Sequence, residues 1–304
     1  MPALDGKCLR RTRLSQQEIL KGYAQYIFMS RAYKNEFDES IVSVQGMTIE
    51  FSSQPIRRAL DNVSISIDKG ETLGLVGESG AGKTTLALAL LGLLPDEARI
   101  VSGNVFWRGQ QLTNLGGREF AKLRGKEIGA IFQDARASLN PVYPVGVQLE
   151  WILRDHLKLT RRQARDRAIE LLVNVHLSDA EVCSNRFPNQ LSGGMCQRVM
   201  IAMAIALGPS LLIADEPTSG LDVLTQAEIL KLLSDISRTT GMSILMITHD
   251  LSVAAAVCDT IAVMREGRLV ECLPIRDFLR NPSSPYSRQL IGAVLDLRER
   301  FTEA

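Results

Sequence analysis

Long apolar runs are missing from this sequence of 304 residues. The longest are Leu86–Leu94 and Val199–Leu207, whereas a membrane-spanning helix needs about 20 predominantly apolar residues. We therefore expect that the chain forms no membrane pore by itself. The polar N-terminus carries Arg10, Arg11 and Arg13, and the apolar stretch of a signal peptide does not follow them.

A charge bias is missing as well, because 35 Lys and Arg residues stand against 34 Asp and Glu residues. The net charge of +1 gives no reason to expect binding to nucleic acid or to an anionic membrane surface. Paired cysteines are also lacking, since the five thiols are scattered without a C-x-x-C pair: Cys8, Cys183, Cys196, Cys258 and Cys272. Such spacing excludes the common zinc motifs and suits a reducing cytosol.

What is present is a globular composition, with 45% apolar and 23% charged residues. Alternation of apolar and polar residues predicts strands at Ile41–Gln45, Met47–Phe51 and Val63–Ile67. Fully apolar strands are predicted farther along the chain, at Leu73–Val76, Leu211–Ala214 and Ser243–Ile247. Apolar strands that alternate with helices indicate a parallel sheet covered on both faces.

Helical patterns lie between these strands. One predicted helix begins at Lys83 and continues to Leu94, before Pro95. Another, Arg161–Val175, places four apolar residues on one face, and a third spans Ala227–Thr239. Because residues from about 134 to 190 are richest in such patterns, we interpret the chain as an α/β core interrupted by a helical insertion.

The first 42 residues are polar and mixed in charge, and their role is open. A Ser and a Glu three residues later resemble a capping box, which predicts a helix at Ser15–Tyr33. The segment is either a docking extension or upstream sequence misread as coding, with Met29 or Met47 as the true start.

A glycine-rich segment, Gly77–Thr84, follows an apolar strand and fits G-x-x-x-x-G-K-[ST]. Glycines let the backbone approach a ligand and point its N–H groups at phosphate oxygens, and the next helix adds the positive end of its dipole. Lys83 would reach the β- and γ-phosphates, and the Thr84 hydroxyl would ligate Mg²⁺. The alternative is a glycine-rich turn without a ligand. The residues expected to bind the nucleotide here are Gly77, Glu78, Ser79, Gly80, Ala81, Gly82, Lys83, Thr84 and Thr85.

Two carboxylates, Asp215 and Glu216, end the apolar strand Leu211–Ala214. Adjacent like charges repel, so the pair points to chemistry, although helix caps at a strand end are the structural alternative. Asp215 is suited to hold Mg²⁺, and Glu216 is suited to act as general base toward the attacking water.

Two further polar residues follow short apolar strands at what would be the same edge of the sheet. His249 would hydrogen-bond the γ-phosphate and orient the water, although a structural histidine is an equal alternative. Gln133 would contact Mg²⁺ or the water. The other histidines, His156 and His176, lie in the helical region and are interpreted as surface or core residues.

The segment Leu191–Met195, Leu-Ser-Gly-Gly-Met, stands just before a predicted helix, Gln197–Leu207. Together with the glycine-rich segment, the acidic pair, Ser219–Asp222 and His249, it makes residues 43–295 resemble the nucleotide-binding subunits of ABC transporters. The resemblance implies a P-loop NTPase core with a mostly parallel sheet, an antiparallel β subdomain and a helical signature subdomain at about 134–195. Residues 296–304 would form a C-terminal tail.

The resemblance also implies further nucleotide contacts. Ser192, Gly193 and Gly194 would contact the γ-phosphate held by a second subunit, and Asp222 would lie in the loop that crosses between subunits. Phe51 would stack on adenine, with an ordinary core phenylalanine as the alternative. Gln133 would begin the loop that faces the membrane subunits.

Finer features resemble the peptide and nickel importer branch of the family, namely Gln133–Val142, Leu191–Ala202 and Asn281–Leu290. Ala135 stands where this branch usually has Pro, and Met195 where other branches commonly have Gln. The implied function is hydrolysis of ATP to energise uptake of peptides, nickel or metal–chelator complexes. An exporter ATPase and a soluble ABC ATPase are the alternatives.

The implied assembly lies peripherally on the cytoplasmic face of the inner membrane. Its other members would be a second ABC ATPase subunit, a paralogue in preference to a second copy, two permease subunits and, indirectly, an external solute-binding protein. ATP and Mg²⁺ are the expected cofactors. Many members of the branch carry a C-terminal cysteine cluster for an iron–sulfur centre, which this sequence lacks, so none is expected.

Overall fold

The computed structural model describes residues 40–52, 56–113 and 117–292. The predicted helix at Ser15–Tyr33 and the predicted tail at 296–304 lie outside the described residues, as does nearly all of the segment 1–42.

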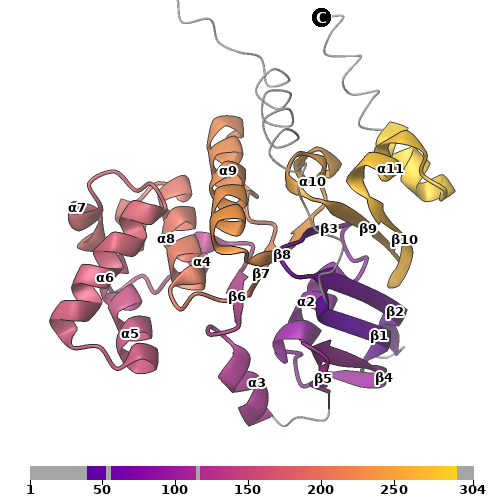
Figure 1. Cartoon of the computed structure of the whole chain (residues 1–304), viewed down its shortest axis with the longest axis horizontal. Coiled ribbons are helices and arrows are strands. Elements are labelled where there is room, and N and C mark those ends of the chain that lie inside the picture. The colour runs from indigo at the N-terminus through magenta and orange to yellow at the C-terminus, as the bar shows by residue number, and fades with distance from the viewer. Residues whose placement is uncertain (1–39, 53–55, 114–116, 293–304) are drawn as a thin grey trace, which may run out of the picture.

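Six strands form the larger of two sheets, in the order β10-β9-β3-β8-β7-β6 (Figure 1). Their bounds are β3 Thr72–Val76, β6 Ile128–Ile131, β7 Leu211–Asp215, β8 Ser243–Thr248, β9 Thr260–Arg265 and β10 Arg268–Pro274. All neighbours are parallel except β10, which runs antiparallel to β9. Strands β3, β7 and β8 are buried along their whole length, as a sheet covered on both faces requires. The predicted α/β fold with a mostly parallel sheet is confirmed.

The smaller sheet is antiparallel, in the order β2-β1-β4-β5. Its strands are β1 Ser40–Phe51, β2 Arg57–Asp68, β4 Ala98–Trp107 and β5 Gln110–Gln111. The two strands predicted at Ile41–Gln45 and Met47–Phe51 are one strand, β1. It stays continuous because Gly46 adopts a left-handed conformation (φ 58°) where the pairing with β2 shifts register.

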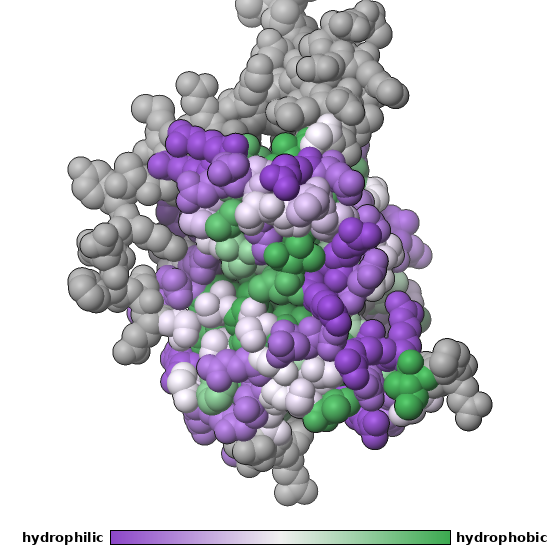
Figure 2. Space-filling model, turned by 90° about the vertical axis from the view of Figure 1, so that its right-hand side faces the viewer, coloured by the Kyte–Doolittle hydropathy of each residue, from purple (hydrophilic) through white to green (hydrophobic). Residues whose placement is uncertain are grey.

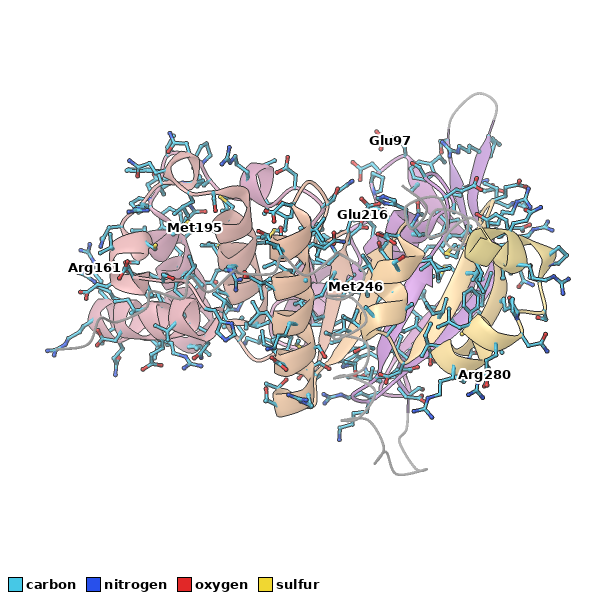
Figure 3. All side chains as sticks on the ribbon, turned by 90° about the horizontal axis from the view of Figure 1, so that it is seen from above. Glu97, Arg161, Met195, Glu216, Met246 and Arg280 are labelled. Carbon is cyan, nitrogen blue, oxygen red and sulfur yellow. The ribbon has the colours of Figure 1, made fainter. Side chains whose placement is uncertain are left out.

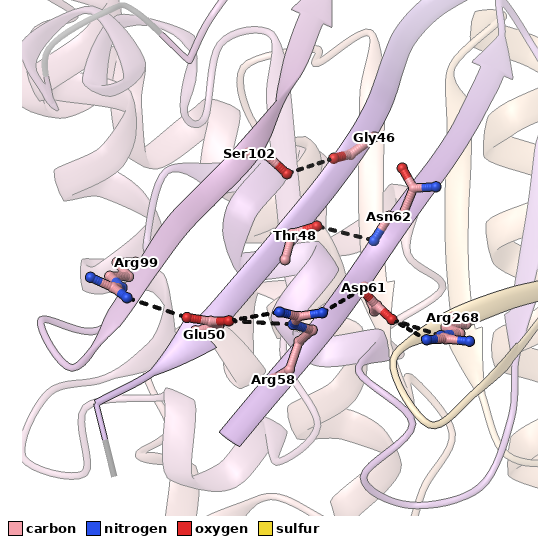
Figure 4. Close-up of polar contacts among 9 residues, drawn as sticks. All are labelled: Gly46, Thr48, Glu50, Arg58, Asp61, Asn62, Arg99, Ser102 and Arg268. Carbon is pink, nitrogen blue, oxygen red and sulfur yellow. Dashed lines mark hydrogen bonds and ion pairs between the residues drawn. The ribbon is translucent and has the colours of Figure 1, made fainter. Parts of the chain in front are cut away.

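A row of ion pairs crosses the antiparallel sheet and reaches the larger one (Figure 4). Glu50 on β1 accepts hydrogen bonds from Arg58 on β2, at 3.1 Å, and from Arg99 on β4, at 3.3 Å. Asp61 on β2 accepts from Arg58 at 3.0 Å and from Arg268 at the start of β10 at 2.7 Å. The arginines are exposed, so each pair adds little stability by itself. Together the pairs join β10 to the edge of the smaller sheet.

Helix α2, Lys83–Leu91, packs its apolar residues in a core shared by both sheets. Its predicted end at Leu94 is wrong. Gly92 takes the left-handed conformation (φ 61°), and its N–H donates to the carbonyl oxygen of Ala89, which terminates the helix after Leu91.

The helical region lies beside β6 and β7 (Figure 1). Its elements are α4 Ala135–Ser138, α5 Val145–Leu157, α6 Arg161–Asn174, α7 Ala180–Ser184 and the short 3-10 helix Pro188–Gln190. The apolar face predicted for α6 is buried, at Ala164, Ala168, Leu171 and Leu172. The remaining helices are α3 Gly117–Leu123, α8 Gly193–Ile205, α9 Val223–Thr240, α10 Leu251–Val257 and α11 Ile275–Arg280.

Within the described ranges, none of the helices has the length and apolar content to span a bilayer. The face shown in Figure 2 is mostly hydrophilic and surrounds a hydrophobic area near its centre. Of the other histidines and cysteines in the described residues, His176 and Cys272 are exposed, His156 is partly buried, and Cys183, Cys196 and Cys258 are buried.

Candidate nucleotide-binding site

The loop Gly77–Gly82 joins β3 to α2 and is packed too closely for larger residues at two positions. A Cβ atom on Gly77 would collide with the carbonyl oxygen of Met264 on β9. Gly82 has φ 101°, and a Cβ atom there would lie 2.6 Å from the carbonyl oxygen of Ala59. The loop is therefore held between strands of both sheets in a conformation that requires glycine.

Lys83 opens α2 and turns its side chain back into this loop. Its Nζ donates to the carbonyl oxygens of Gly77, at 2.7 Å, and Glu78, at 2.9 Å. The residue is only 6% exposed, and burial lowers the pKa of the amine although nearby carboxylates oppose that shift. No side chain caps the helix at Gly82, so the first turn keeps free N–H groups beside a cation. This is the arrangement of an anion site.

Thr84 and Asp215 meet next to that loop. The Thr84 hydroxyl donates to Asp215 Oδ2 at 2.9 Å, across from α2 to the end of β7. Asp215 is 8% exposed, and burial raises the pKa of its carboxyl while the bond from Thr84 opposes the rise. A hydroxyl and a buried carboxylate are oxygen ligands of the kind Mg²⁺ takes, and a divalent cation would offset the cost of keeping that carboxylate ionised. The pair therefore fits a magnesium ion.

Glu216, the next residue, is bonded by Gln133 and His249, which follow the two strands beside β7, namely β6 and β8. Its Oε2 accepts from Gln133 Nε2 at 2.9 Å, and its Oε1 lies 2.8 Å from His249 Nδ1. Its backbone is left-handed (φ 47°), and its N–H donates to the carbonyl oxygen of Ile247. Non-glycine residues rarely adopt this conformation, which turns successive side chains apart so that Asp215 faces Thr84 while Glu216 faces His249.

Ser192 caps helix α8 by accepting a hydrogen bond from the Met195 N–H at 3.2 Å. Asp222 caps α9 in the same way, accepting from the N–H and hydroxyl of Thr225 at 3.1 and 2.7 Å. The two caps are neighbours, because a Cβ atom on Gly194 would lie 2.6 Å from Thr225 Cγ2. The residues predicted to contact the ATP of a second subunit, together with Asp222 of the predicted crossing loop, thus form one exposed corner of the chain: Ser192, Gly193, Gly194 and Asp222.

That corner is separate from the phosphate loop. Figure 3 places Met195 on the helical side of the molecule and Glu216 near its middle. The structure thus brings the predicted residues together as two groups rather than one. The first contains Gln133, Lys83, Thr84, Asp215, Glu216 and His249, and the second contains Ser192, Gly193, Gly194 and Asp222.

Phe51 ends β1 and is partly exposed. It belongs to neither of the two core clusters formed by the described residues, so its ring is not an ordinary core side chain. Its strand partners across the sheet are Arg57 and Ala98.

One contact of the loop was not predicted. The Tyr286 hydroxyl donates to Glu78 Oε1 at 3.1 Å, across 208 residues of sequence. Tyr286 lies in the motif Asn281–Leu290, but no local pattern indicates which distant residue such a tyrosine contacts.

A cavity of about 1000 Å³ lies elsewhere, at the edge where β7 and β8 begin. It is lined by Ser210 and Met242, which precede these strands, and by residues of α5, α6 and α9. The predicted site residues lie at the opposite ends of β7 and β8 and do not line it. Of the predicted site residues, Thr84 and Asp215 line a separate small recess between α2 and the ends of β6 and β7.

Residues 60–219 match the family described as "ABC transporter". The chain belongs to the ABC transporter family. Among curated members of the family it is 42% identical, over 270 residues, to the probable peptide ABC transporter ATP-binding protein y4tR of Sinorhizobium fredii. That match covers 88% of this chain and 81% of y4tR. The oligopeptide transport ATP-binding protein OppD of Bacillus subtilis is also 42% identical, over 86% of this chain and 74% of its own length.

Solved ABC transporter cassettes share the fold. The dimeric structure of MJ0796 in a post-hydrolysis state, bound to ADP and Pi, aligns with a TM-score of 0.70 and 30% identity. It covers 77% of this chain and 99% of the MJ0796 chain. A second, cbiO1 of Clostridium perfringens, aligns with a TM-score of 0.70 and 26% identity over 86% of this chain and all of its own.

These matches confirm that this ABC transporter family member is an ATP-binding subunit that hydrolyses ATP in transport, and that it falls in the peptide importer branch. The exporter and soluble ATPase alternatives are not favoured by them.

Proposed function

We propose that this chain powers the uptake of small peptides, from the cytoplasmic face of a membrane, by closing with a second ATPase subunit on Mg²⁺ and ATP. The observation that carries the proposal is the bonded set of Gln133, Glu216 and His249 beside Thr84 and Asp215. The names of relatives, such as the oligopeptide transport protein OppD, support peptides as the cargo. The ATPase domain would span residues 43–295.

The loop Gly77–Gly82 and the first turn of α2 form the proposed phosphate cradle, and these residues would bind the triphosphate. Lys83 holds two backbone carbonyls in the structure, and we expect its ammonium to exchange them for β- and γ-phosphate oxygens. The N–H groups from Gly80 to Thr85 would take the remaining oxygens. Thr84 and Asp215 would hold Mg²⁺, which neutralises phosphate charge when bound. Phe51 would stack its partly exposed ring on adenine.

Glu216 would accept the proton of the attacking water. Gln133 and His249 bond its two carboxylate oxygens from opposite sides, and this fixes the direction in which the carboxylate faces a water. His249 is exposed and would also hydrogen-bond the γ-phosphate. Gln133 would contact Mg²⁺ or the water while its loop faces the permeases.

The second group of residues, at the exposed corner, would serve the ATP of the other subunit. Ser192 caps α8, and the N–H groups of the first turn of this helix suit the γ-phosphate of an ATP bound to the partner. The partner would be a second ABC ATPase, with two permease subunits and an external solute-binding protein completing the importer.

Measuring uptake in cells tests which solute the importer transports. A strain that lacks this gene would be complemented with the wild-type chain or with Lys83→Ala, and uptake of labelled peptides and of nickel would be measured in each. We expect peptide uptake only with the wild-type chain and nickel uptake that is the same in all strains. Nickel uptake that follows the gene while peptide uptake does not would overturn the peptide assignment.

A further inference from the structure

The segment Ser283–Tyr286 is fixed to the larger sheet by one buried carboxylate. Glu271 on β10 is 7% exposed and accepts hydrogen bonds from the Ser283 N–H, at 2.7 Å, and from its hydroxyl, at 2.5 Å. Burial would raise the pKa of Glu271, but these bonds outweigh it and hold that pKa below its ordinary value. The segment is therefore anchored at β10, next to β9 (Figure 1).

Tyr286 extends from this anchor to the glycine-rich loop. It is 7% exposed, and the guanidinium of Arg265, at the end of β9, lies 4.8 Å from the centre of its ring. The hydroxyl donates to Glu78 Oε1 at 3.1 Å. Burial and the neighbouring Glu78 both raise the pKa of Tyr286, so the hydroxyl keeps its proton at neutral pH and remains a donor.

Glu78 connects this contact to the phosphate loop. Its carbonyl oxygen accepts from Lys83 Nζ, and its side chain is exposed on the loop itself. A carboxylate at this position repels the triphosphate that the loop would bind, and it competes for the N–H groups that would bind phosphate. Where its side chain is held therefore matters for ATP affinity.

We propose that Tyr286 is a positioning residue for ATP binding. Its hydroxyl ties the Glu78 carboxylate to the segment Ser283–Tyr286, and this bond would keep the carboxylate from turning toward the N–H groups beside Lys83. This inference rests on the proposed phosphate cradle. It gives the segment Ser283–Tyr286, which supplies none of the proposed nucleotide contacts, a share in setting the affinity for ATP.

Tyr286→Phe tests this because it removes the hydroxyl and keeps the ring. We expect the Kd for Mg²⁺–AMP-PNP and the KM for ATP of the full-length chain to rise about threefold to tenfold, with kcat within about twofold of wild type. Glu78→Asp keeps the charge but shortens the side chain out of reach, so we expect the same weakening. Glu78→Ala removes the charge and provides the background in which the effect of Tyr286→Phe is measured again.

The double variant of Tyr286→Phe and Glu78→Ala separates this role from a general structural one. If the hydroxyl acts through Glu78, Tyr286→Phe changes the Kd by less than about twofold once Glu78 is Ala. Equal weakening in both backgrounds, or wild-type affinity of Tyr286→Phe and Glu78→Asp, overturns the inference. Tyr143→Phe is the matched control, since that ring packs edge-on against Trp151 in the helical region. Normal affinity in Lys83→Ala would instead show that the cradle assignment itself has failed.

Discussion

At the scale of single residues, Glu216 is set apart by its surroundings rather than by its own chemistry. Its two carboxylate oxygens are bonded by Gln133 and His249, and its left-handed backbone directs the side chain to that side. A general base needs this kind of fixed direction more than it needs proximity alone.

Glu216→Gln keeps the shape of the side chain and removes the proposed general base. We expect ATP turnover to fall by about 100-fold or more while binding of Mg²⁺ and ATP is retained, because Lys83, Thr84 and Asp215 are untouched. Steady-state phosphate release and equilibrium nucleotide binding are the two measurements.

The control for this variant is Glu228→Gln. Glu228 is an exposed carboxylate on α9 that pairs with Arg198 and lies outside the proposed site. It should hydrolyse ATP at the wild-type rate. A Glu216→Gln chain that turned over as fast as this control would remove Glu216 from its role as base.

A second residue-scale prediction concerns Glu271. Because its folded pKa lies below the ordinary value of 4.5, its ionised form stabilises the folded chain at pH values above 4.5, and that stabilisation is lost as the pH falls through the folded pKa. Glu271→Gln should therefore lower the thermal unfolding temperature by about 3 °C or more at about pH 7, and by less as the pH approaches about 4.

Differential scanning fluorimetry across that pH range makes the comparison, with Glu170→Gln as the exposed control. A deficit in Glu271→Gln that stayed constant down to acid pH would mean that packing, not the ionised carboxylate, anchors the segment Ser283–Tyr286.

At the scale of elements, α8 and α9 meet through a glycine. Alanine is intrinsically better than glycine in a helix by about 1 kcal/mol, yet a Cβ atom on Gly194 would lie only 2.6 Å from the Thr225 methyl. We expect Gly194→Ala to destabilise the chain by about 1–3 kcal/mol, measured by urea unfolding, because the clash outweighs the gain in helix propensity.

Thr225→Ser should rescue that variant. The serine lacks the methyl group that clashes but keeps the hydroxyl that donates to Asp222. Gly193→Ala is the matched control, since its Cβ atom would lie 3.5 Å from Leu221, an ordinary contact, and its stability should equal or exceed that of wild type. Failure of Thr225→Ser to restore stability would contradict the proposed contact.

The elements also show what the sequence could predict. Buried strands β3, β7 and β8 and the face of α6 follow from runs and periods of apolar residues, which depend on local sequence alone. The end of α2 was missed because Leu93 and Leu94 continue the apolar pattern, while the conformation of Gly92 decides the boundary. The bond from Tyr286 to Glu78 depends on how β9 and β10 place the segment Ser283–Tyr286, and no local sequence pattern predicts that placement.

At the scale of the whole molecule, the two groups of proposed site residues lie on different parts of one chain (Figure 3). The glycine loop and Glu216 belong to the edge of the larger sheet, and Ser192 belongs to the helical side. Because the two groups lie apart in one chain, the proposed function needs two chains to complete one site. The dimeric MJ0796 cassette, similar in fold, was solved with ADP and Pi.

This requirement predicts that binding and turnover can be separated by mutation. Ser192→Arg should bind ATP as tightly as wild type, because its own cradle is intact, yet it should neither form an ATP-dependent pair nor hydrolyse ATP. Lys83→Ala should lose ATP binding but keep the exposed corner around Ser192 able to contact the ATP of another subunit. Analytical ultracentrifugation with Mg²⁺ and AMP-PNP, and phosphate release with Mg²⁺ and ATP, measure the two properties.

Mixing the two defective chains then identifies the partner. A pair of one Ser192→Arg chain and one Lys83→Ala chain contains one intact site, made of the first chain's cradle and the second chain's Ser192, so turnover returns if the chain pairs with a second copy. If the natural partner is a paralogue, the mixture stays inactive and the ATPase that copurifies with the wild-type chain restores turnover to Ser192→Arg instead. Wild-type turnover by Ser192→Arg alone would contradict the two-chain site, because the arginine would then be harmless at a position that must admit a phosphate.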